Sequence, residues 1–115
     1  MELVQKHNIG NFYVKDATTC AKGAFKYLGL KGWKFEVSPA GSLCEHKSKT
    51  IYLHNKLFPN YPYLIKYWIC HEIAHIYSWP KDQMHGPLYH KWLGIIMLLL
   101  MTKARRKDIW RLAYK

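Results

Sequence analysis

One short motif, His71-Glu72-Ile73-Ala74-His75, constrains this 115-residue chain more than any other feature of its sequence. Side chains four residues apart lie on the same face of an α-helix, so both imidazoles can reach one metal ion. The surrounding residues predict a helix over residues 63–77, because apolar side chains recur there at helical spacing. Glu72 lies next to the first histidine and can take a proton from a water molecule that attacks a carbonyl. The alternative interpretation is a surface helix with two solvated histidines and a solvated glutamate.

A catalytic zinc ion needs a third protein ligand, and three residues downstream of the motif are candidates. His85 is the best placed, because it lies ten residues after His75, beyond the helix break at Trp79-Pro80. The following Gly86-Pro87 predicts the start of another helix, which puts His85 at the mouth of that helix. The alternatives are His90, inside the next helix, and Asp82, in the loop. We therefore predict one Zn²⁺ per chain, bound by His71, His75 and His85.

The rest of the chain predicts an α+β domain with a small sheet. A first helix is expected up to about residue 27, capped by Asp16, Thr18 or Thr19 and ended by Gly29. Three short strands are expected over residues 33–37, 42–45 and 49–54, followed by a loop over residues 55–62. A last helix is expected over residues 87–103, after the metal helix. The sequence thus predicts one domain over residues 1–115, with an N-terminal helix, a three-stranded sheet, the metal helix and a C-terminal helix.

The charge of the chain is strongly unbalanced, with 18 Lys and Arg against 7 Asp and Glu, a formal net charge of +11. Such an excess favours a polyanionic partner such as DNA, through neutralisation of phosphates, although the same charge can serve only to keep a chain soluble. The segment 103–115 is basic with interspersed aromatic residues, and it offers phosphate contacts at Lys103, Arg105, Arg106, Lys107 and Arg111. The alternative interpretation of this segment is a solvated helix that packs on the domain through its apolar residues.

Three further features bear on where such a chain works. Its most apolar stretch, residues 92–101, is about half as long as a membrane-spanning helix, so no membrane partner is expected. Cys20, Cys44 and Cys70 are widely spaced and form no C-x-x-C pair, which predicts free thiols in a reducing, cytoplasmic environment. The small size fits a phage or bacterial protein and is compatible with a monomer.

The segments HEIAHIYSW and MHGPLYHKW resemble the SprT-like zinc metalloproteases, the family that includes Spartan. The upstream segments GWKFEV, AGSLCEH and KTIYLH occur in the order of that family, so the likeness covers about residues 31–101. Tyr89 stands where the family usually has Phe or Trp, and Leu88 where an acidic residue is common. The resemblance implies a minimal zincin-like fold in which the histidine of the second motif, here His85, is the third zinc ligand.

The activity that the resemblance implies is a zinc-dependent endopeptidase, with a protein or peptide as substrate and Glu72 as general base and then general acid. The candidates for contact with the oxyanion or the substrate are Tyr77, Tyr89 and His90. A second hypothesis is a peptidase that DNA recruits or activates. A third is a non-proteolytic zinc-containing module that binds DNA or protein.

Overall fold

The computed structural model describes the backbone of residues 2–61, 64–81, 84–102 and 106–113, and side chains from residue 14 onward within these ranges except at the ends of the last one. The chain divides into two compact units, Met1–Ile69 and Cys70–Lys115, which we call unit 1 and unit 2. The boundary falls inside α3 (Ile65–Ser78), and each unit is described by itself. That residues 1–115 form one domain stays a prediction.

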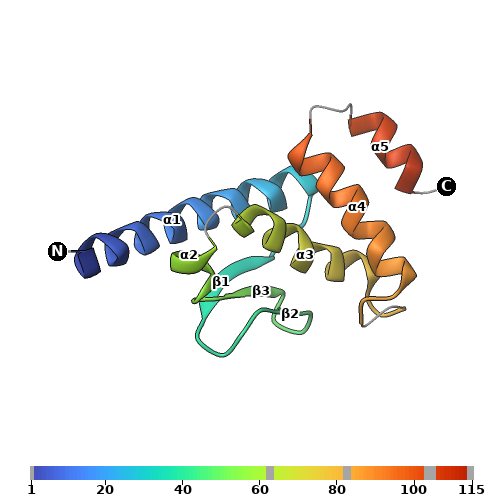
Figure 1. Ribbon diagram of the computed structural model, residues 1–115. Coiled ribbons are helices and arrows are strands. Elements are labelled where there is room, and N and C mark those ends of the chain that lie inside the picture. Colours follow the sequence, from blue (N-terminus) through green and yellow to red (C-terminus); the bar gives the residue numbers. More distant parts are fainter. Residues whose placement is uncertain (1, 62–63, 82–83, 103–105, 114–115) are drawn as a thin grey trace. The chain divides into compact units, whose positions relative to one another are not determined.

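The N-terminal helix of unit 1, α1 (Glu2–Leu28), begins well before the predicted start (Figure 1). The expected start was wrong because Thr18, one of its predicted caps, is satisfied inside the helix. Its hydroxyl donates a hydrogen bond to the Val14 carbonyl at 2.9 Å, and such a bond one turn back does not end a helix. The predicted end at Gly29 is confirmed. Gly29 has φ 71°, and the Leu30 amide donates to the Phe25 carbonyl at 2.8 Å, as in a glycine-capped helix end.

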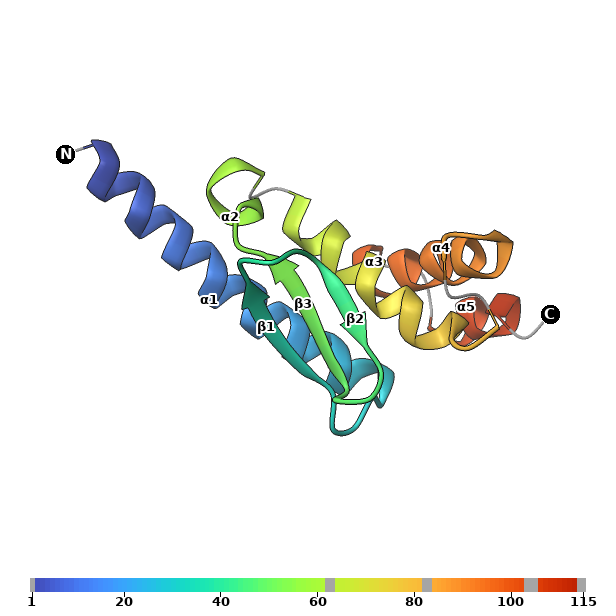
Figure 2. The ribbon, with the colours of Figure 1, turned by 90° about the horizontal axis from the view of Figure 1, so that it is seen from below.

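Three strands form the sheet of unit 1, as the sequence predicts: β1 (Lys34–Ser38), β2 (Leu43–Glu45) and β3 (Thr50–His54). Their order is β1-β3-β2, with β1 parallel and β2 antiparallel to the central β3 (Figure 2). The register pairs Lys34 with Thr50 in the parallel ladder and Glu45 with Thr50 in the antiparallel one. Each strand begins and ends within one residue of its predicted bounds.

The core of unit 1 joins the sheet to the helices. α1 contacts β1 and a short helix, α2 (Leu57–Asn60), which lies in the segment predicted as a loop. Phe58 of α2 is only 1% exposed, and burying a side chain of this size stabilises a fold by about 1.5–3 kcal/mol. This burial accounts for the helical turn that the prolines of the segment argue against. The other large contributors to this core are Phe25, Leu28, Ile51, Leu53 and Ile65.

The described residues of unit 2 form helices joined by turns and bends. α4 (Pro87–Met101) begins at the proline predicted as its first residue and ends two residues before its predicted end. α5 (Arg106–Ala113) follows and packs on α4, with Ile109 only 3% exposed. The Tyr77 ring of α3 stacks on Trp92 of α4 at 4.7 Å between centroids, and Trp110 of α5 lies 6.5 Å from Trp92. Through these three rings, α5 packs near the C-terminal end of α3.

Over its described residues the chain therefore has five helices and one small three-stranded sheet, which confirms the predicted α+β class. None of the helices in the described ranges is long and apolar enough to cross a membrane.

Candidate metal centre

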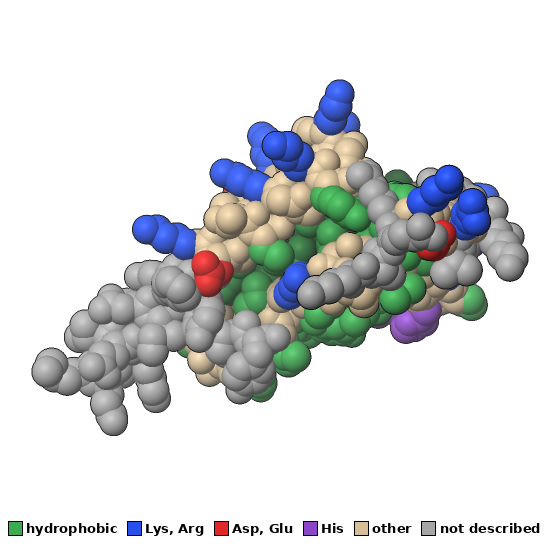
Figure 3. Space-filling view, turned by 90° about the horizontal axis from the view of Figure 1, so that it is seen from above, with side chains coloured by type: hydrophobic (Ala, Val, Ile, Leu, Met, Phe, Trp, Pro, Cys, Tyr) green, Lys and Arg blue, Asp and Glu red, His purple; other side chains and the backbone are tan. Residues whose placement is uncertain are grey.

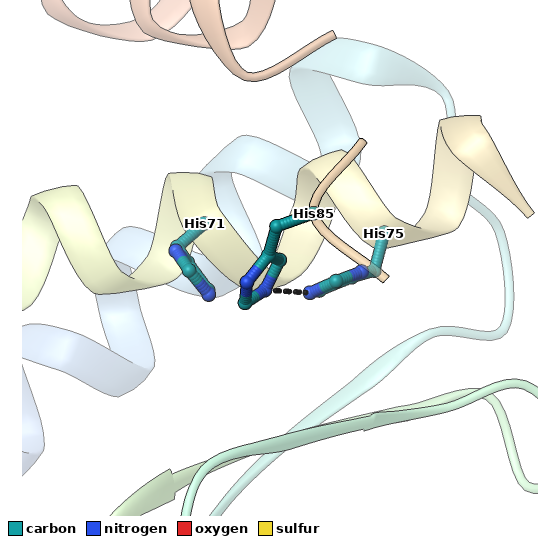
Figure 4. A group of neighbouring side chains, drawn as sticks. All are labelled: His71, His75 and His85. Carbon is teal, nitrogen blue, oxygen red and sulfur yellow. Dashed lines mark hydrogen bonds between the residues drawn. The ribbon is translucent and has the colours of Figure 1, made fainter. Parts of the chain in front are cut away.

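The two histidines of the motif lie one turn apart on α3, as their spacing predicts. Their ring centroids are 5.5 Å apart, and both side chains are half-buried. His85 directly precedes Gly86, the N-cap of α4. Its ring centroid lies 4.9 Å from that of His71 and 5.0 Å from that of His75. Figure 4 shows the three imidazoles turned toward one another. The two segments that the sequence assigned to one site thus meet within unit 2.

The nitrogen atoms of the cluster suit a single small cation. One ring nitrogen from each of the three histidines lies within 4.8 Å of the others. The Nε2 atoms of His75 and His85 are 3.2 Å apart. Two nitrogens that bind the same tetrahedral zinc at about 2.0–2.1 Å are about 3.4 Å apart, so this pair needs almost no adjustment. The donor set and its spacing therefore fit zinc.

Glu72 is the most buried carboxyl group among the described side chains. It is 3% exposed, and among the described residues its Oε2 atom has no hydrogen-bond partner. Burial raises the pKa of Glu72 from 4.5 to about 7. A dication bound by the neighbouring imidazoles would stabilise the ionised carboxylate, since opposite charge favours the charged form. The unsatisfied carboxylate is thus a second feature that fits a metal ion.

The environment of His71 favours the neutral imidazole, the form that binds metal. Desolvation, with a smaller contribution from charge repulsion by His85, His75 and His90, lowers the pKa of His71 from 6.5 to about 4. Near neutral pH the ring therefore needs to release no proton before it binds a cation.

Tyr89 lies behind the three imidazoles. It is 1% exposed, and its ring centroid lies 5.4 Å from His71, 4.5 Å from His75 and 4.6 Å from His85. Its hydroxyl donates a hydrogen bond to the backbone carbonyl of His71 at 3.2 Å. Tyr89 therefore links the first turn of α4 to the backbone of the first ligand. A contact with a substrate oxyanion, which the sequence suggested, would require this hydroxyl to leave the carbonyl, and that role stays a prediction.

The other predicted site residues lie around the cluster. His90 is exposed, with its ring 5.4 Å from that of Tyr89, and is not one of the three residues whose nitrogens converge. Tyr77 belongs to the aromatic cluster with Trp92. Asp82, the alternative ligand, lies outside the described residues, as do Lys103 and Arg105 of the basic segment. Arg106 begins α5 without a described side chain, and Lys107 and Arg111 are exposed on that helix.

Sequence reasoning missed the link between Tyr89 and His71. The signal for it was weak: Tyr89 follows His85 by four residues, which places an aromatic ring one helical turn beyond the third ligand. Only the packing of α4 against α3 within unit 2 reveals that its hydroxyl reaches the backbone of His71.

Comparison of the chain with protein-family models, with curated proteins and with solved structures gives no match. Membership of the SprT-like family therefore stays a prediction from the two motifs.

Proposed function

We propose that this chain is a zinc-dependent endopeptidase of the SprT-like, zincin type, acting on a protein or peptide substrate. The observation that carries the proposal is the convergence of three imidazoles from two segments, with nitrogens within 4.8 Å, beside a buried carboxylate. A structural zinc site usually has four protein ligands, whereas three ligands are typical of catalytic zinc.

The chain's own residues have distinct parts in this proposal. His71, His75 and His85 bind the ion, which when bound supplies Lewis-acid polarisation of a carbonyl and activation of water. Glu72 accepts a proton from the attacking water and returns it to the leaving amine. Burial raises the pKa of Glu72 to about 7 in the metal-free chain, and a bound dication would lower it again and favour the ionised form that accepts the proton.

The first test of this proposal is the zinc content of the purified protein. Wild type should contain one zinc per chain, His85→Ala should lose it, and His90→Ala, the matched control on α4, should keep it. Loss of zinc from His90→Ala with retention in His85→Ala would show that the third ligand is His90 and not His85. A wild type that takes up no zinc, even when zinc is added, would end the proposal.

The second test is hydrolysis of an unfolded protein such as casein. Chelation should abolish cleavage, and Glu72→Gln should slow it by about 10³-fold while zinc content stays unchanged, since general acid–base catalysis contributes about 10²–10⁴-fold. Equal cleavage by wild type and Glu72→Gln would point to a contaminating protease.

The alternative is a non-proteolytic zinc-containing module that binds DNA or protein. The net charge of +11 and the exposed Lys107 and Arg111 on α5 favour it. Under this alternative, zinc binds in full but no protein substrate is cleaved.

A further inference from the structure

The lysines of unit 1 are not spread evenly over its surface. Three of them, Lys15, Lys22 and Lys26, are exposed on α1 at spacings of seven and four residues. At 100° per residue these positions fall within about 40° of one another, so they form one row along the helix. Figure 3, which looks down on unit 1 from the side of α1, shows Lys and Arg side chains following this line.

A second group of lysines lies at and just after the turn that follows α1. Lys31 is exposed in the turn after the helix, and Lys34 is exposed at the start of β1. The Lys34 amide donates to the Lys49 carbonyl at 2.8 Å, which brings the exposed Lys49 of the β2–β3 turn to the same place. Gly32 lies next to the Lys49 side chain. A Cβ atom added at position 32 would be 3.7 Å from Cδ and 3.9 Å from Nζ of Lys49. We call these six residues the lysine track: Lys15, Lys22, Lys26, Lys31, Lys34 and Lys49.

Three exposed acidic residues, Asp16, Glu36 and Glu45, lie in the stretch of chain that carries the track. Within the described part of the chain, none of the six ammonium groups forms an ion pair with a carboxylate. Six unpaired like charges repel one another, so their gathering is explained best by a partner that supplies negative charge.

The length of the track indicates what kind of partner this is. From Lys15 to Lys26 the helix rises about 16 Å, and Lys31 follows in the turn after it. A mononucleotide or a free phosphate would contact only one or two of these lysines. One strand of a nucleic-acid duplex presents a phosphate about every 3.4 Å along its axis and matches an extended row. A lipid surface is the other extended polyanion, and the vesicle arm of the test below distinguishes it from a duplex.

We propose that the lysine track binds the phosphate backbone of a nucleic-acid duplex. The contacts are to phosphates and not to bases, since lysine side chains on one helical face follow a backbone without entering a groove. Binding is therefore independent of nucleotide sequence and strongly dependent on salt. The track shares no residue with the basic segment 103–115 or with the metal centre.

The test is binding of a fluorescent duplex of about 20 base pairs, followed by anisotropy between about 50 and about 200 mM salt. Six phosphate contacts predict a slope of log K against log salt near −5, at about 0.9 per contact. The variant Lys22→Gln/Lys26→Gln/Lys31→Gln should flatten the slope by about 2.7. The matched control, Lys56→Gln/Lys66→Gln/Lys91→Gln, removes the same charge from exposed positions outside the track and should change the slope by less than about 1.

Three results would overturn the inference. The first is an equal loss in the control variant, which would mean that net charge alone drives binding. The second is an unchanged slope in the track variant. The third is binding to vesicles containing phosphatidylserine without binding to the duplex. Chelation of metal should leave duplex binding unchanged, so this outcome is independent of the proposed peptidase activity.

Discussion

The histidine site and the lysine track place charge-bearing side chains in opposite surroundings. The site gathers three imidazoles and a carboxylate within fifteen residues of chain, 71–85, and buries Glu72 almost completely. The track draws six ammonium groups from 35 residues, 15–49, and leaves all of them exposed. Burial strengthens the electrostatic interactions of each group at the site. At the track, solvent weakens the interactions of each single charge, so only the combined charge of the six lysines has a large effect.

The largest effect that would sharpen this contrast is on stability. The raised pKa of Glu72 means that the folded, zinc-free protein resists its ionisation, so this group destabilises the fold as pH rises from 4.5 through 7. Glu72→Gln should stabilise the zinc-free protein by less than about 1 kcal/mol near pH 5 and by about 3 kcal/mol near pH 8. His71 titrates in both proteins, so its opposite contribution cancels in the difference.

Urea unfolding of both proteins in the presence of chelator measures this prediction. The triple glutamine variant of the track is the control, and its stability should stay within about 0.5 kcal/mol of wild type at both pH values. A pH-independent difference between Glu72→Gln and wild type would show that the carboxylate is better solvated than its burial indicates.

A smaller effect is expected at α5, which combines features of both regions. This helix has exposed basic residues but is anchored by the buried Ile109. Ile109→Ala should lower the free energy of opening α5 by about 2 kcal/mol, because it removes buried methyl groups. Hydrogen exchange of the α5 amides measures the opening, and Lys107→Ala should leave it within about 0.5 kcal/mol. Equal effects of the two changes would mean that α5 is not docked.

The smallest effect concerns the support of the first ligand. Tyr89→Phe keeps the ring behind the imidazoles and removes the hydrogen bond to the His71 carbonyl. Zinc affinity should fall by about 10-fold, at the lower end of the range for residues that orient a ligand. Competition with a chelating dye measures it, and Tyr77→Phe, in the neighbouring aromatic cluster, should change affinity less than about 2-fold. A larger loss for Tyr77 would shift the support of the site to that cluster.

The same contrast explains what the sequence could predict. The spacing of His71 and His75, the position of His85 before Gly86-Pro87, and the end of α1 at Gly29 all depend on a few neighbouring residues, and the structure has all three. The three strands could be predicted for the same reason, because the local composition of each segment favours a strand.

What could not be predicted depends on contacts between distant segments. The short α2 depends on the burial of Phe58 in the core of unit 1. The lysine track requires Lys49 to lie beside the turn after α1, and this follows only from the parallel pairing of β1 with β3.

The ten-residue separation of His75 and His85 has a consequence for the order of folding. Closing a loop of this length takes about 10–100 ns in a flexible chain, and the entropy that it costs grows only slowly with length. The parallel pairing of β1 with β3 begins at Lys34 and Thr50, sixteen residues apart, and must form around the intervening β2. In a complete chain refolding from denaturant, we therefore expect the histidine loop to close before the strands pair, which takes about 1–10 μs even for a simple hairpin, so that the three imidazoles can capture zinc before the sheet has assembled.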